Sequence, residues 1–543
     1  MAPSAANPPR PDLRLACLSG RGASLLPSGL FEVLRALKRH YQTRAFPFFF
    51  VPSSPDDADE NFPDCAFLHY QPQPEADLAA QATRWLEAYG PEIVVATDAF
   101  SLKASLAAAP RPAAILYYPA GGEETAPSGV LRCPKNPAGL AELFPRLPSP
   151  PPAREKPQLI YCDPTLYDEK GHYWKYARNV FSGLRAAGAS VTAVTNRMLS
   201  VPLAEADLIL PLFWVDAWCN TTSLPGHPGH PQAIELCQAH LELALQAAQA
   251  GPGDHVFLPP LQDKLFVGMA TKVRELAARF PVTWHFLLWD PLTVESLGRL
   301  GAIKALRLSI PQERLRFYAD TAEFCRSHEQ LTRTPFALLP VPIEPSAADF
   351  KISPIRDGRL RVSFLGNARD EKGFLLLPSL VAACRDLVEA GLLEFHIQLY
   401  QLNFHPIMVE AARQLRELGR QGLAVLVEGT LDANEYARMV DEADVLLCLY
   451  NPNQYKERSS MIFFEGTCSE KAVLIARGCA VANLLPSGCP WVCGTLGEAV
   501  EALRTLCRDH EEGGRRWARQ VGPAFRAEHN GRRFAEILLS PRP

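Results

Sequence analysis

The sequence lacks any long hydrophobic run, which argues against a membrane-spanning helix. Its apolar stretches, such as residues 45–51, are far shorter than the roughly 20 residues that cross a bilayer as a helix. The opening stretch, MAPSAANPPRPD, has no apolar core of the kind found in signal peptides. We therefore expect a cytoplasmic protein, with peripheral membrane contact compatible with the sequence. Residues 1–11 are expected to be disordered.

A basic excess and paired cysteines are missing as well. The 543 residues carry 55 Lys and Arg against 59 Asp and Glu, a formal net charge of -4, whereas nucleic-acid binders usually show a basic excess. None of the 14 cysteines lies in a Cys-x-x-Cys pair, so no zinc site or other metal site is predicted. Free cysteines are typical of a reducing compartment. We expect no nucleic-acid partner.

The sequence does contain three successive series of alternating strand and helix patterns, too many residues for one hydrophobic core. Proline-rich stretches at 147–157 and 337–358 separate the series. The alternation predicts an α/β fold with parallel, doubly wound sheets. The predicted regions are an extra N-terminal α/β region at 12–150, a domain at 157–345, a domain at 355–525 and a C-terminal helix at 526–543.

Individual elements follow from apolar runs and helical periodicity. In the first series we expect strands at 13–18, 45–51, 93–96 and 113–118, and helices at 30–39 and 78–89. In the second we expect strands at 159–164, 190–195, 207–211, 256–258 and 284–288, and helices at 171–188, 233–248 and 265–279. In the third we expect strands at 360–366, 395–400, 424–428, 445–450 and 472–476, and helices at 375–390, 406–421, 433–442 and 460–469.

The stretch 449–469, LYNPNQYKERSSMIFFEGTCS, carries the most chemical information. A strand leads into a polar loop, and Ser459 or Ser460 suits the N-cap of the next helix. The free N–H groups and positive dipole of a helix N-terminus favour a diphosphate. Glu465, further along the helix, can accept two ribose hydroxyls. The alternative interpretation is an ordinary N-cap followed by a solvated glutamate.

Two other predicted strand ends carry weaker signals. The stretch 364–373, FLGNARDEKG, combines Gly366 with Arg369 and Lys372, which are suited to phosphate oxygens. The stretch 427–431, VEGTL, offers backbone groups for a base edge. Alone, the first stretch is a weak signal beside the interpretation as a common charged loop, and the second is better explained as a plain turn. Adjacent strand ends in a doubly wound domain, however, line one crevice.

Residues 360–485 resemble the C-terminal domain of the family-4 (group 1) glycosyltransferases, which have the GT-B fold of two Rossmann-like domains facing a cleft. Glu457 and Glu465 show the E-x7-E spacing of that family, and Tyr455 begins a YxxRSSxIFxE form. The resemblance implies that Glu465 binds the ribose of a nucleotide sugar and that Glu457 contacts the sugar as a catalytic residue. The implied donor-binding residues are Gly366, Asn367, Arg369, Lys372, Glu428, Gly429, Arg458, Ser459, Ser460, Met461 and Glu465.

Residues 158–342 resemble, more loosely, the acceptor-side domain of the same family. The loop DPTLYDEKGH stands in the place of its first βα turn. Asp163 and Gly171 are implied acceptor-side residues, and His172 is a second catalytic candidate whose alternative role is structural. The segment 532–539 is expected to cross back onto this domain. No activity is assigned to residues 12–150.

The resemblance implies sugar transfer from a nucleoside-diphosphate sugar to a hydroxyl of a glycan, a lipid-linked or another acceptor. Retention of configuration is expected, without a metal and without a cofactor beyond the co-substrate. Several family positions differ: Asn367 replaces an arginine, Met461 a glycine, and Glu470 and Ala472 a glycine and a proline. Two alternatives therefore stay open, a non-catalytic binding or scaffold partner, and a nucleotide-sugar epimerase or sugar phosphorylase.

Overall fold

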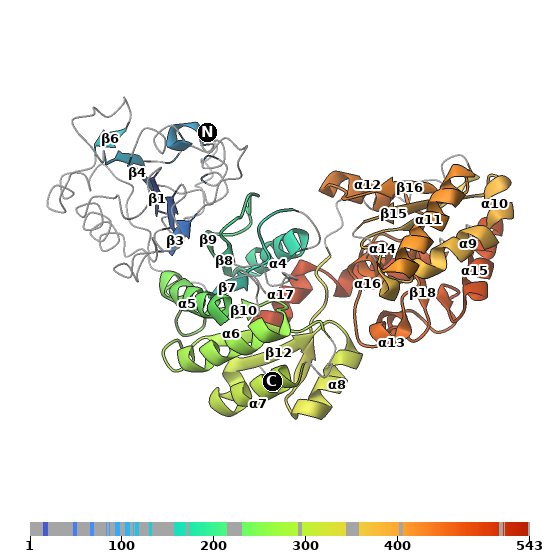
Figure 1. Ribbon diagram of the computed structural model, residues 1–543. Helices are drawn as coiled ribbons and strands as arrows, with labels where there is room; N and C mark the ends of the chain where they lie inside the picture. Colours follow the sequence, from blue (N-terminus) through green and yellow to red (C-terminus); the bar gives the residue numbers. More distant parts are fainter. Residues whose placement is uncertain are drawn as a thin grey trace, which may run out of the picture.

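Three sheets follow one another along the chain (Figure 1). The computed structural model describes residues 157–169, 173–213, 231–290, 296–343, 358–400, 405–509, 514 and 516–540. In the first 132 residues it describes mainly the strands of an N-terminal sheet. The expected disorder of residues 1–11 and the expected helix at 30–39 lie outside these residues.

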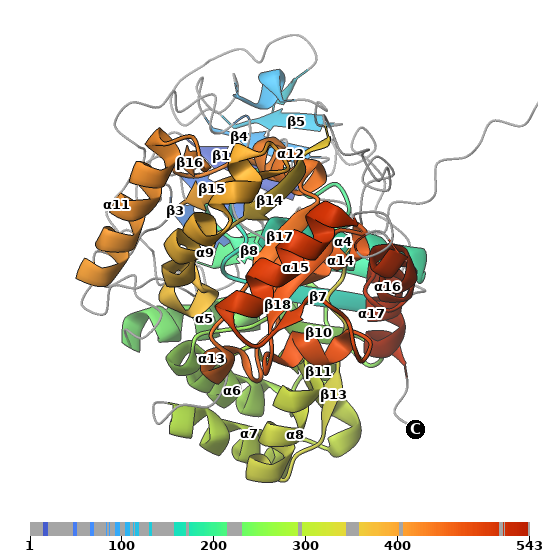
Figure 2. The same ribbon diagram turned by 90° about the vertical axis from the view of Figure 1, so that its right-hand side faces the viewer.

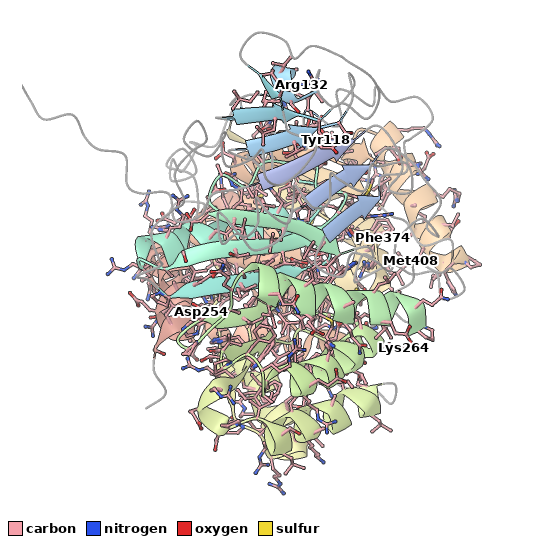
Figure 3. The ribbon with its side chains drawn as sticks, turned by 90° about the vertical axis from the view of Figure 1, so that its left-hand side faces the viewer. Tyr118, Arg132, Asp254, Lys264, Phe374 and Met408 are labelled. Carbon is pink, nitrogen blue, oxygen red and sulfur yellow. The ribbon has the colours of Figure 1, made fainter. Side chains whose placement is uncertain are left out.

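The N-terminal sheet has the strand order β3-β2-β1-β4-β5-β6, with all neighbours parallel. Its strands are β1 (Leu15–Ser19), β2 (Pro47–Phe50), β3 (Ala66–His69), β4 (Ile93–Ala96), β5 (Ala114–Tyr117) and β6 (Leu131–Arg132). Neither β3 nor β6 is among the strands expected from the sequence. The β2–β3 edge lies beside an edge strand of the next sheet, β9 (Leu208–Phe213) (Figure 3).

The middle sheet has seven parallel strands in the order β13-β12-β11-β10-β7-β8-β9. Besides β9 they are β7 (Gln158–Asp163), β8 (Ser190–Asn196), β10 (His255–Leu258), β11 (Thr283–Leu287), β12 (Leu315–Ala319) and β13 (Phe336–Leu338). The connecting helices are α4 (Tyr173–Ala186), α5 (Pro231–Ala247), α6 (Asp263–Leu276), α7 (Leu297–Ser309) and α8 (Ala322–Thr332). Most of these strands are buried along their whole length, which explains why apolar residues predominate in them.

The C-terminal sheet has six parallel strands in the order β16-β15-β14-β17-β18-β19. They are β14 (Leu360–Phe364), β15 (Leu393–Leu399), β16 (Val425–Glu428), β17 (Val445–Cys448), β18 (Ala472–Ala476) and β19 (Val492–Cys493). The helices are α9 (Leu377–Ala383), α10 (Arg385–Glu389), α11 (Pro406–Arg420), α12 (Ala433–Glu442), α13 (Pro452–Tyr455), α14 (Met461–Cys468), α15 (Leu496–Arg508) and α16 (Arg516–Glu528). The single helix expected at 375–390 is two helices, because the backbone leaves helical geometry at Cys384 (φ -102, ψ 13).

The doubly wound topology is confirmed. In each sheet the first strand of the series lies inside the sheet, and the strand order reverses next to it. These reversals fall between β7 and β10 in the middle sheet and between β14 and β17 in the C-terminal sheet. Ligands of such folds bind beyond the carboxyl ends of the strands at this point. The candidate site is therefore sought at the ends of β14 and β17.

The chain returns to the middle domain at its C-terminus. The last helix, α17 (Gly531–Leu539), packs on α4 (Figures 1 and 2). Gly183 of α4 permits this approach, because a Cβ there would lie 1.9 Å from the carbonyl oxygen of Gly531. Where the chain crosses, the backbone N–H of Ile343 donates to the carbonyl of His529 (3.2 Å). Ile343, where the described chain leaves the middle domain, therefore lies beside His529, where it returns.

Candidate functional site

The loops that follow β14 and β17 are fixed against each other by a glycine. Gly373 has φ +78, and a Cβ there would lie 2.1 Å from the carbonyl oxygen of Leu449. The backbone N–H of Asn451 also donates to the carbonyl of Glu371 (2.9 Å). Only glycine allows both the left-handed backbone and the close approach. The close approach holds residues 366–373 next to the segment that leads to α14.

Lys372 places a half-buried cation at this junction. A Cβ on Gly366 (φ +94) would lie 3.1 Å from Lys372 Nζ and 3.4 Å from Cδ1 of Ile462. The ammonium therefore lies over Gly366, close to the first turn of α14. Burial, together with the charge of Arg369, lowers the pKa of Lys372 to about 8. An anion at this position would stabilise the charged form.

The N-terminus of α14 offers backbone donors beside Lys372. Ser460 is the N-cap, and its Oγ accepts a hydrogen bond from the N–H of Phe463 (3.3 Å). Its hydroxyl also shares a hydrogen bond with the hydroxyl of Tyr450 (2.8 Å). Because the helix begins at Met461, the N–H groups of Met461 and Ile462 have no carbonyl partner within the helix. These two amides are oriented as an anion-binding pair.

The three residues before Ser460 contact the middle domain. The Ser459 hydroxyl donates to the carboxylate of Asp320, and the Thr321 hydroxyl donates to the backbone carbonyl of Glu457. Arg458 lies 3.5 Å from Oδ1 of Asp290. The hydroxyls of Ser459 and Ser460, which the resemblance places among the donor-binding groups, are thus both engaged by protein groups here. Backbone amides, not hydroxyls, are the donors left at the start of α14.

Glu465 is 5% exposed and lies where two other helices reach it. Its Oε2 accepts a hydrogen bond from the hydroxyl of Tyr436 in α12 (2.6 Å), and its Oε1 accepts one from Lys175 in α4 (3.2 Å). Burial, with the Glu465 charge beside it, holds the pKa of Tyr436 well above its usual range. The phenol therefore stays a hydrogen-bond donor to the carboxylate.

A glutamine joins two strand ends along the C-terminal sheet. Oε1 of Gln398 accepts from the N–H of Gly366 (2.9 Å), and its Nε2 donates to the carbonyl of Gly429 (3.1 Å). Gly429 has φ +89, so the turn after β16 depends on a left-handed glycine. Gln398 is buried and fixes the turns after β14 and β16 relative to each other.

Other expected site residues contribute less. The carboxylate of Glu428 is exposed and forms a bidentate ion pair with Arg416 of α11 (2.9 and 3.2 Å). Both of its oxygens are therefore already paired. Asn367 forms an isolated parallel bridge with Tyr400. Arg369 is half-exposed and lies 3.5 Å from Glu371.

On the middle-domain side, Asp163 ends β7 and is buried, but its Oδ1 accepts from the N–H of Thr165 (2.8 Å) and from the Thr165 hydroxyl (2.5 Å). Its position supports the local turn. Gly171 and His172 lie outside the residues that the structure describes.

Comparison with known proteins identifies this architecture. No family model matches the sequence, and no curated protein matches it. Among solved structures, the trehalose-6-phosphate protein from E. coli bound with UDP-2-fluoro glucose matches with a TM-score of 0.53 at 12% identity, over 71% of this chain and 100% of the other. A UDP-forming alpha,alpha-trehalose-phosphate synthase from Burkholderia xenovorans matches with a TM-score of 0.51 at 13% identity, over 71% and 98%. A glycosyltransferase from Rickettsia africae matches with a TM-score of 0.51 at 9% identity, over 72% and 100%.

The chain has the GT-B fold. The expected two Rossmann-like domains of that fold are confirmed, and the N-terminal sheet is additional to them. At identities this low the likeness establishes the GT-B fold alone. The share of this chain left unmatched is about the size of the N-terminal region.

The GT-B cleft contains residues that the sequence analysis misses, namely Lys175, Asp290, Asp320, Thr321, Gln398 and Tyr436. Asp290 and Asp320 follow apolar runs, FLLW and FYA, as Asp163 follows LIYC. An acidic residue directly after a buried strand was thus an available signal. Burial raises the pKa of Asp320 to about 7, against the opposing effect of the Ser459 hydrogen bond and with a smaller contribution from the Asp290 charge.

Two absences hold for the described part of the GT-B chain. No group of three or more His, Cys, Asp or Glu residues in that part is placed to hold a metal ion. No helix in the same part is long and apolar enough to cross a membrane.

Proposed function

We propose that this protein is a glycosyltransferase that moves a sugar from a nucleoside-diphosphate sugar to an acceptor hydroxyl. The observation that carries the proposal is the position of the half-buried Lys372 ammonium beside Gly366 and the first turn of α14. A partly buried cation next to two amides without a partner in their own helix is suited to a diphosphate. Two of the matched structures are named for a UDP-sugar or for forming UDP, so a uridine nucleotide is the first donor to test.

In this proposal the leaving diphosphate binds Lys372 and the amides of Met461 and Ile462. These groups are already oriented before reaction, so they stabilise the charge that develops on the leaving group without reorganisation. The ribose hydroxyls bind Glu465, where Tyr436 keeps one carboxylate oxygen oriented and the ribose displaces Lys175 from the other. The sugar lies near Glu457.

The acceptor approaches from the middle domain, between the ends of β7 and β12. We propose a glycan, lipid-linked or other hydroxyl acceptor, transfer with retention of configuration, and no metal or cofactor besides the nucleotide sugar. Closure of the two domains excludes water, which limits donor hydrolysis. Arg369, half-exposed at the cleft, adds a second positive charge toward the diphosphate.

A second candidate is a non-catalytic GT-B protein that binds a partner. It is favoured by the engagement of Ser459 and Glu465 with the middle domain, which occupies two of the expected donor contacts.

A nucleotide-binding panel separates the two candidates. Calorimetry and thermal shift would be run with UDP, GDP, ADP and their common sugar conjugates. The glycosyltransferase proposal expects one nucleotide family to stabilise the wild type, with at least tenfold weaker binding by Lys372→Met and Glu465→Gln. Lys304→Met on α7 and Glu498→Gln on α15 are matched controls that should bind as wild type. Folded wild-type protein that binds none of these nucleotides would overturn the proposal and leave the partner role.

A further inference from the structure

The junction between β12 and α8 of the middle domain faces the loop of the C-terminal domain that contains Glu457, the first residue of the E-x7-E pair. β12 ends at Ala319, Asp320 follows, and Thr321 is the N-cap of α8, where its Oγ1 accepts from the N–H of Phe324 (3.3 Å). β12 is buried along its whole length, and one face of α8 is buried in the middle domain. Asp320 and Thr321 therefore have a rigid base.

Three consecutive residues of the loop each make one contact with the middle domain. Thr321 binds the Glu457 carbonyl, Asp290 pairs with Arg458, and Asp320 accepts from the Ser459 hydroxyl. Within the described residues, these groups of the loop make no other hydrogen bond or ion pair. The backbone just before the N-cap Ser460 is thus held from across the cleft.

Asp320 lowers the stability of the fold at this position. It is 4% exposed, and its Oδ1 has no hydrogen-bond partner among the described residues. An unpaired oxygen of a buried carboxyl costs stability that an apolar residue would not. Its one side-chain partner among the described residues is Ser459. The interaction that this carboxyl gains is therefore a hydrogen bond to the loop of the other domain.

We propose that Asp320 is a positioning residue of the donor site, which holds Ser459 and thereby sets the approach of the loop to the first turn of α14. The inference rests on the proposed function, because it assigns to the loop the task of presenting the amides of Met461 and Ile462 to a diphosphate. Thr321 assists by fixing the carbonyl of Glu457.

Ionisation of Asp320 gives the proposal a second readout. The groups around its carboxyl are Asp290 after β11, Tyr176 on α4, Cys325 on α8 and the Ser459 hydroxyl. Opening of the cleft removes the cover that the loop provides, so the pKa of Asp320 falls toward its ordinary value. The closed form then takes up a proton relative to the open form. Donor binding by the closed form weakens as the pH rises through 7.

The test uses the full-length protein and UDP-glucose, whose phosphates do not titrate in this range. Calorimetric Kd values would be measured between pH 6 and 8.5 for wild type, Asp320→Asn, Asp320→Ala, Ser459→Ala and the double Ala variant. Glu323→Gln is the control, because Glu323 also contacts the other domain, at Asn483 (3.0 Å), but away from the loop.

We expect wild type and Glu323→Gln to bind several-fold more weakly at pH 8.5 than at pH 6. Asp320→Asn keeps an acceptor for Ser459 without a charge, so its Kd should change less with pH than that of wild type, and the dependence that remains comes from Lys372, whose pKa is about 8. Asp320→Ala should bind about tenfold more weakly than wild type at pH 6, and Ser459→Ala should add little to it. Ser459→Ala changes a half-buried loop residue, so it tests the contact even if Asp320→Ala does not fold.

Equal Kd values for wild type and both single Ala variants, with an unchanged pH dependence in Asp320→Asn, would overturn the inference alone. Wild-type protein that binds neither UDP-glucose nor any other nucleotide sugar would overturn the proposed function and the inference together.

Discussion

Lys175 of α4 donates a hydrogen bond to Glu465 of α14 over 3.2 Å, although the two residues belong to different domains. The lysine side chain is 45% exposed, whereas the glutamate side chain is 6% exposed. Such half-exposed pairs stabilise by only about 0–1 kcal/mol. The contact is therefore weak enough for a ribose to replace it.

Removal of Lys175 should strengthen nucleotide binding. Lys175→Met frees Oε1 of Glu465 while Tyr436 still orients the carboxylate, so we expect the Kd for UDP-glucose to fall by up to about fivefold. Calorimetry at one pH, with Lys304→Met as the control, measures the change. Weaker binding by Lys175→Met would instead mean that the lysine contacts the nucleotide directly.

The amide of Met461, and not its side chain, is expected to matter. Met461→Ala should keep the wild-type Kd within about twofold. Met461→Pro removes the N–H at the first helical position, where proline is well tolerated, and Ser460 has the extended backbone that precedes proline (φ -146, ψ 118). A lost hydrogen bond to a charged group costs about 1.5–3 kcal/mol, so the Kd should rise at least tenfold. Similar Kd values for the Pro and Ala variants would remove this amide from the site.

Gly373 should be required for stability for two reasons, its left-handed backbone and the close approach of the Leu449 carbonyl. Gly373→Ala adds a methyl group 2.1 Å from the Leu449 carbonyl, at φ +78. Gly488 has a similar φ of +81, but a Cβ there meets nothing within 4 Å. We expect Gly488→Ala to cost about 1–2 kcal/mol from the left-handed backbone alone. Gly373→Ala should shift the apparent urea midpoint of unfolding much further, and equal shifts would mean that the loops relax apart.

Asp320→Asn should stabilise the fold in a pH-dependent way. Folding raises the pKa of this carboxyl from its ordinary 3.8 to about 7. Relative to the unfolded chain, stability is therefore unaffected at low pH and is lost progressively as the pH rises from about 4 to 7. At about 1.4 kcal/mol per pKa unit, the loss above pH 7 is up to about 4 kcal/mol. Asp320→Asn avoids it.

Thermal unfolding of the two proteins across pH 4.5–8.5 measures this effect. The melting temperature of Asp320→Asn should exceed that of wild type at pH 8, and the gap should shrink toward pH 4.5. A gap that is constant with pH would show that ionisation of Asp320 is not its source.

The sequence allows a good prediction of the C-terminal sheet and a poor one of the end of the middle sheet. β14, β17 and β18 are apolar runs that are buried on both faces, so composition alone identifies them. The interruption of β12 by Arg316 conceals that strand. The charge is tolerated because Arg316 donates to the carbonyl of Leu538 in α17 (3.1 Å), 222 residues away. Partners that distant leave no local pattern.

Some residues of the candidate site can likewise be predicted from the sequence, and others cannot. Lys372 and the start of α14 follow from loops at strand ends, where residue type and position along the chain are enough. Asp320 contacts Ser459 across 139 positions of sequence, and nothing near either residue indicates the other. Tyr436 approaches Glu465 from a helix whose sequence gives no sign of that contact.

The paired crossing at Ile343 and His529 has a consequence for the way in which the molecule moves and comes apart. Topologically the C-terminal domain is inserted between β13 and α17 of the middle domain, and the chain leaves and returns at the neighbouring residues Ile343 and His529. Such a paired connection permits rotation of the C-terminal domain about one axis and resists separation of the two domains. A cut after α16 would release no independent tail. It would remove from the middle domain the Phe534 ring, which packs edge-on against Tyr176 and Phe257, so α17 completes the core of the middle domain.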